Sequence, residues 1–93
     1  MQIGVLTLSF NLPGCRSLKE KRQRLGGLKE RFGRQPGLAV CESAYSDAHQ
    51  RAQWSFVAAA QTLRLVEKTL GDVERKVVET VDAQLVDVAR EIL

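Results

Sequence analysis

The chain has 93 residues, of which 44% are hydrophobic and 27% charged, and it carries a net charge of +3. This length and composition predict one globular domain, residues 1–93, and two cysteines are too few for a disulfide framework. No apolar run reaches the roughly 18 residues of a membrane span, and the N-terminus lacks a signal-peptide pattern. We therefore expect a cytoplasmic protein with no membrane partner.

The charge is distributed unevenly along the chain. Residues 1–41 hold eight lysines and arginines against two acids, whereas residues 42–93 hold six basic residues against nine acids. This asymmetry permits a polyanion to associate with the basic half of the molecule.

The N-terminal segment is predicted to be a strand that ends in a turn. Residues 2–10 place Leu6, Leu8 and Phe10 on one face, with partly apolar residues on the other face as well. Pro13-Gly14 then breaks the strand and turns the chain.

A basic helix is predicted over about residues 18–32. Ser17 and Glu20 have the spacing of a capping box at its start. Gly26-Gly27 costs about 1 kcal/mol per glycine relative to alanine, and it fits either close packing on a sheet or a bend. Apolar residues on one helical face are Leu18, Leu25, Leu28 and Phe32. The remaining surface carries Arg16, Lys19, Lys21, Arg22, Arg24, Lys29, Arg31 and Arg34.

The next two elements are predicted to form a hairpin. Residues 38–44 and 52–61 are predicted strands, joined by the polar loop 45–50. An alanine run in the second strand leaves a helical alternative open, but Trp54 and Phe56 favour a strand whose aromatic side chains face the core.

The C-terminal part is predicted to be a helix followed by a last strand, residues 83–92. Thr62 is a plausible N-cap, and Gly71 interrupts the helix at some cost in stability. An amphipathic stripe supports the helix, with apolar residues at Leu63, Val66, Leu70, Val73 and Val77.

The resulting order, βαββαβ, predicts an α+β, ferredoxin-like sandwich in which two helices cover one face of a four-stranded antiparallel sheet. The other sheet face has no helix over it, and Ile3 and Val5 on that face predict a homodimer. The expected core comprises Leu6, Leu8, Phe10, Leu18, Leu25, Leu28, Val40, Trp54, Phe56, Val66, Leu70, Val73 and Val88.

Several motifs give the chain a resemblance to a known family. They are Leu12-Pro13-Gly14, the hexad Ser17–Arg22, Val40, Glu42, Asp47 and the triplet Gln50-Arg51-Ala52. With these motifs the chain resembles the YlxP-like family of small bacterial proteins from Gln2 to Leu93, and departs from it at Pro36 and His49. The resemblance implies a ferredoxin-like fold, a bacterial cytosolic protein, and a role near translation initiation or ribosome maturation. It implies no known reaction.

The basic helix is the first candidate site. Its lysines and arginines fit contacts with nucleic-acid phosphates, although the same pattern fits a solvated helix face. The predicted nucleic-acid-binding residues are Arg16, Lys19, Lys21, Arg22, Arg24, Lys29 and Arg31.

The polar hairpin loop is the second candidate site, formed by Glu42, Asp47, Gln50 and Arg51. The simplest interpretation of these four residues is structural: Arg51 forms an ion pair with Glu42 or Asp47 across the base of the hairpin. The chain lacks the paired spacing of a zinc site, so we expect no metal and no cofactor.

The two thiols are expected to stay reduced and dispensable. Cys15 is read as inert, and Cys41 is expected to behave as a small hydrophobic residue in an apolar run.

Three functional hypotheses remain. The first is a non-enzymatic accessory protein that associates with ribosomal RNA or a ribosomal subunit through the basic helix. The second is a dimeric protein-interaction module. The third is a small enzyme with its site in the 42–51 loop.

Overall fold

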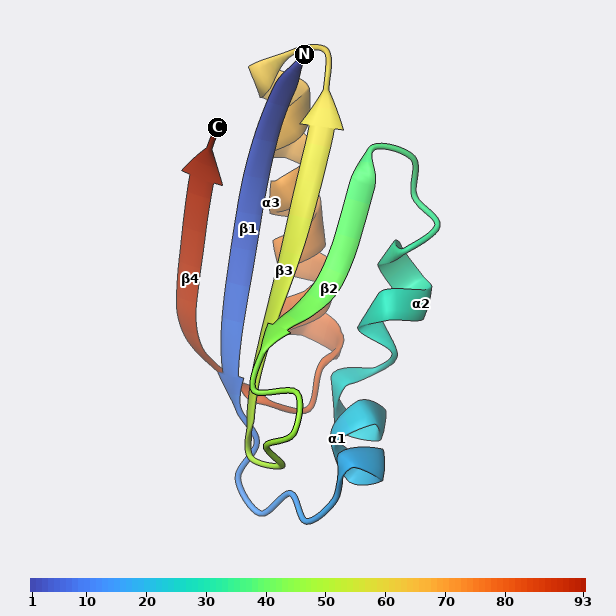
Figure 1. Ribbon diagram of the computed structural model, residues 1–93, viewed down its shortest axis with the longest axis vertical. Helices are drawn as coiled ribbons and strands as arrows, with labels where there is room; N and C mark the ends of the chain where they lie inside the picture. The colour runs from blue at the N-terminus through green and yellow to red at the C-terminus, as the bar shows by residue number, and fades with distance from the viewer.

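Four strands, β1 (Gln2–Asn11), β2 (Leu38–Ala44), β3 (Arg51–Ala60) and β4 (Gln84–Ile92), form one antiparallel sheet in the order β2-β3-β1-β4. The computed structural model describes all residues, 1–93. Three helices, α1 (Leu18–Leu25), α2 (Leu28–Phe32) and α3 (Leu63–Thr80), complete the chain. Figure 1 shows α3 running behind β1 and β3, with α1 and α2 beside β2. This confirms the predicted α+β fold. None of the helices is long and apolar enough to cross a membrane.

The core lies between the sheet and the helices. Leu6, Leu8 and Phe10 of β1 are buried on the side that the helices cover. Phe56 of β3 lies on the same side and meets Phe32 of α2 edge to face, with ring centroids 5.6 Å apart. The period-2 pattern of the strands therefore identified the covered sheet face correctly.

Four residues of the expected core are not fully buried. Val88 is 42% exposed, because β4 is an edge strand and α3 packs over the two central strands. Leu18, Val40 and Trp54 are half-buried. Cys41, expected to behave as a hydrophobic residue, is exposed on the sheet face without helices.

The basic segment is two helices rather than the predicted single one. Gly26 and Gly27 have φ angles of 72° and 67°, a left-handed conformation that no α-helix continues through. The two glycines therefore mark a bend between α1 and α2.

Candidate functional site

Lys21 points inward from α1, which corrects the prediction that it faces solvent or a ligand. Ser17 caps the helix by accepting a hydrogen bond from the Glu20 amide at 3.0 Å. One turn in, the Lys21 ammonium donates to the carbonyl oxygens of Tyr45 and Ala48, each at 2.8 Å. It also forms an ion pair with Glu42 at 2.9 Å. Lys21 is only 3% exposed. Two hydrogen bonds to loop carbonyls and one ion pair to β2 hold the ammonium, so Lys21 fastens the β2–β3 hairpin to α1.

Two further basic residues are held by the protein itself. The Arg24 guanidinium donates to the carbonyl oxygens of Asp82 and Pro13, both at 2.9 Å, and pairs with the Asp82 carboxylate at 3.4 Å. Arg31 donates to Thr80 Oγ1 at 2.7 Å. These contacts connect the α1–α2 segment to the end of α3 and the loop after it.

The remaining cations of this segment form what we call the basic face. They are exposed and take part in none of the six ion pairs of the molecule. Four were predicted as binding residues, while Arg34, which follows α2, was not included in that set. The basic face consists of Arg16, Lys19, Arg22, Lys29 and Arg34.

The hairpin-loop candidates do not converge on one site. Glu42 lies opposite Trp54 on the helix-covered sheet face and is paired with Lys21. Arg51 is across from Asn11 on the other face, where its guanidinium lies 4.0 Å above the Tyr45 ring and donates to the Tyr45 hydroxyl at 2.9 Å. The predicted ion pair of Arg51 is therefore wrong for both partners. The strand register places Glu42 on the opposite side of the sheet, and Asp47 takes part in no ion pair.

The other two loop candidates are also separate. The Gln50 side-chain amide donates to the Cys15 carbonyl oxygen at 3.4 Å, and Asp47 is exposed without a polar partner. No group of three or more histidine, cysteine or acidic side chains is placed to hold a metal ion.

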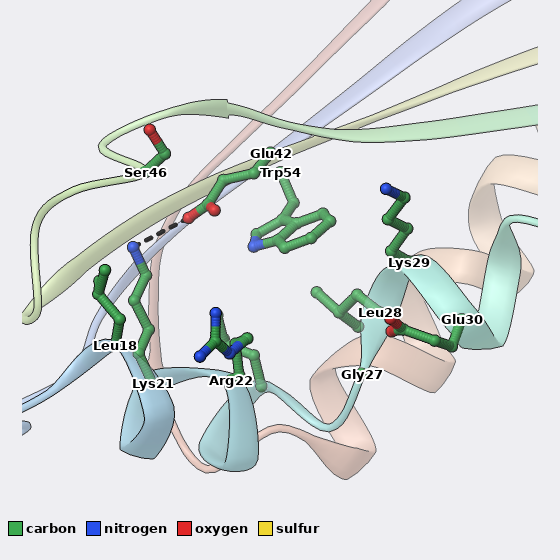
Figure 2. A pocket seen from close by; sticks show the side chains of 11 residues that line it. Leu18, Lys21, Arg22, Gly27, Leu28, Lys29, Glu30, Glu42, Ser46 and Trp54 are labelled. Carbon is green, nitrogen blue, oxygen red and sulfur yellow. Dashed lines mark ion pairs between the residues drawn. The ribbon is translucent and has the colours of Figure 1, made fainter.

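A pocket of about 300 Å³ lies between the α1–α2 segment and the β2–β3 hairpin. We call it the Trp54 pocket. Figure 2 shows Arg22 and Lys29 reaching toward it from α1 and α2, with the Lys21–Glu42 ion pair at one end. The Trp54 indole nitrogen is buried and has no hydrogen-bond partner. Sequence reasoning missed this pocket, since it assigned Trp54 to the closed core.

The fold and the site together define a small ferredoxin-like α+β protein with an unpaired basic face bordering a pocket. Residues 3–90 match the family described as protein of unknown function (DUF503), and the chain belongs to that family. No curated protein matches the chain.

Proposed function

We propose that the protein is a non-enzymatic accessory protein that binds RNA in the cytoplasm, on the ribosome or a ribosomal subunit, through the basic face. One observation carries this proposal: five cations between residues 16 and 34 are exposed and have no acidic partner. The resemblance to the YlxP-like family, consistent with the unknown-function family that matches, supports a role in translation or ribosome maturation.

Phosphate neutralisation is the physical basis of the proposal. Unpaired lysines and arginines displace counterions from nucleic-acid phosphates, so binding weakens as salt rises. Contacts with phosphates position a protein without reading bases, so we expect weak sequence preference from the basic face alone.

The test compares two charge-matched double variants for binding to ribosomal subunits and to a generic RNA at several salt concentrations. Lys19→Gln with Arg34→Gln removes two cations of the basic face, and Arg64→Gln with Lys76→Gln removes two exposed, unpaired cations of α3. The first pair should weaken binding and flatten the slope of log affinity against log salt by about 1.4. Equal affinities and slopes for the two variants would contradict the proposal.

A homodimer is a second candidate, favoured by the sheet face without helices. That face presents Ile3, Val5 and Val57, and Val57 is 36% exposed. An exposed apolar patch on a sheet face is a common interface between two copies of a chain. Sedimentation equilibrium should show an average mass that rises with protein concentration. Val57→Asp should lower this average mass at a given concentration. A parent protein that stays monomeric at high micromolar concentration would rule the dimer out.

A further inference from the structure

We propose that the Trp54 pocket accepts one unstacked nucleotide of single-stranded RNA, with the base at Trp54 and the RNA backbone held by Arg22 and Lys29, which lie on either side of the indole (Figure 2). This inference rests on the proposed RNA-binding function and names the part of the RNA that this surface selects.

The pocket has the size and lining that a single nucleotide requires. Its volume of about 300 Å³ is at the lower end of the range for small-ligand pockets. Leu18, Leu25 and Leu28 supply apolar walls beside the Trp54 ring, whereas the charged groups come from Arg22 and its neighbours. An aromatic ring with aliphatic walls suits a base, and the charged part suits the backbone.

The Trp54 indole nitrogen provides an unused hydrogen-bond donor. It is buried without an acceptor, although buried indole N–H groups normally find one. Figure 2 shows this nitrogen facing the space between Glu42 and Arg22. Arg22 is exposed and has no ion pair, so its guanidinium is free to bind the backbone of the nucleotide whose base enters here. Every nucleobase carries an oxygen or ring nitrogen that can accept from this donor.

The charges around the pocket match one phosphodiester. Lys21 and Glu42 neutralise each other at 2.9 Å. Of the remaining lining residues, Arg22 and Lys29 outweigh Glu30 by a single positive charge. Lys19 and Arg34 of the basic face lie outside the pocket lining and remain exposed for other phosphates of the RNA.

A single strand fits this pocket better than a duplex. In an RNA duplex the bases are paired and stacked, so a side chain cannot enclose one of them. The pocket therefore predicts a preference for single-stranded RNA. The basic face alone predicts no such preference.

The pocket can be monitored directly, because Trp54 is the only tryptophan of the chain. Tryptophan emission of the parent protein is recorded during titration with an oligouridylate, an RNA duplex, inorganic polyphosphate and uridine monophosphate. The anisotropy of labelled RNA is followed in parallel. The oligouridylate should change the emission with the same midpoint as the anisotropy. Duplex and polyphosphate should bind without this change, and the monophosphate should act only at concentrations at least 100-fold higher.

Variants separate the pocket from general phosphate binding. Trp54→Phe keeps an aromatic ring but removes the N–H donor, and should weaken single-strand binding several-fold while leaving duplex binding unchanged. Arg22→Gln with Lys29→Gln should weaken single-strand binding about 10-fold. It should also lower the ratio of the affinity for single-stranded RNA to the affinity for duplex RNA. The matched control, Lys19→Gln with Arg34→Gln, should weaken both RNAs equally.

The outcomes distinguish the two proposals. Absence of any salt-dependent RNA binding in the anisotropy would overturn the proposed function and this inference together. RNA binding with unchanged Trp54 emission and no preference for single strands would overturn only the inference. An equal response to uridine monophosphate and oligouridylate would also overturn it, since the ligand would then be a free nucleotide.

Discussion

The two helical regions cover the same sheet face but are built differently. α3 runs for 18 residues without a break and buries one stripe, Val66, Leu70, Val73 and Val77. Two of its cations, Lys68 and Arg75, pair with Asp72 at 3.4 and 3.0 Å. The α1–α2 segment is broken at Gly26 and Gly27, and most of its cations are either unpaired or turned toward backbone carbonyls.

This difference separates a scaffold from a surface available for binding. α3 is stabilised by apolar packing and partly neutralises its own charge, so little charge remains for a partner. The α1–α2 segment buries Leu25, Leu28 and Phe32 as well, but polar contacts of Lys21 and Arg24 add to this packing, and the cations of the basic face are left exposed. Disturbing the two regions should therefore have distinguishable effects.

The largest expected effect is on the polar fastening of α1. Lys21→Met removes the ammonium, which leaves the Glu42 carboxylate without its countercharge and two carbonyl oxygens without their donor. We expect a loss of about 2–4 kcal/mol in the free energy of unfolding, measured by chemical denaturation. Lys19→Met, at an exposed position on the same helix, should change it by less than about 0.5 kcal/mol.

Adding Glu42→Gln to Lys21→Met should recover part of this loss, because no unpaired charge then remains. Equal stabilities of the Lys21→Met and Lys19→Met variants would show that α1 is held by apolar packing alone, as α3 is.

The second prediction concerns the packing of α3. A Cβ atom at Gly4 would lie 2.7 Å from Val66 Cγ1 and 3.0 Å from Leu70 Cδ1, so Gly4→Ala forces these side chains of α3 to shift. The expected loss is about 1–3 kcal/mol by chemical denaturation. Val66→Ala should lower the free energy of unfolding by less in the Gly4→Ala background than in the parent, because the smaller side chain makes room for the new methyl group. An unchanged stability of Gly4→Ala would mean that this contact is not close.

The third prediction exchanges glycine for alanine in both regions. At Gly71, inside α3, a new Cβ meets nothing within 4 Å, so Gly71→Ala should raise the free energy of unfolding by about 0.5–1 kcal/mol. At Gly26, whose φ is 72°, the same change should lower it by about 1 kcal/mol. Thermal unfolding of both variants shows whether each substitution raises or lowers the stability. Two changes in the same direction would contradict the bend between α1 and α2.

The smallest effect is expected from the charges on α3. Hydrogen bonds from Arg75, and then from Lys68, hold the pKa of Asp72 below its ordinary value. The folded state therefore favours the ionised carboxylate. Its stabilising contribution is complete above the unfolded-state pKa and is lost as the pH falls below about 4.

Denaturation of the parent and of Asp72→Asn from pH 7 to pH 3 checks this. The difference in stability between them should shrink in acid and also in high salt, because solvent reaches the half-buried carboxylate. Asp87→Asn, at an exposed position without an ion pair, is the control. A parent–variant difference that is independent of pH would contradict the role of Asp72.

The sequence by itself determined the fold and most of the element boundaries. Alternation along β1 and the stripe of α3 are local patterns, and each is set by which face must be buried. The caps at Ser17 and Thr62 are also local, since each hydroxyl bonds an amide three residues away. The bend was not decided, because Gly26-Gly27 fits a helix interior as well as a left-handed turn.

Only the tertiary structure decided what the candidate site contains. A lysine such as Lys21 is expected to face solvent. It turns inward here because the fold places two carbonyl oxygens and the Glu42 carboxylate beside its ammonium, from residues that lie 21 to 27 positions further along the chain. The register of β2 and β3 separates Glu42 from Arg51, although the loop brings them close in sequence. These arrangements depend on how distant segments meet, and no local pattern of residues encodes that meeting.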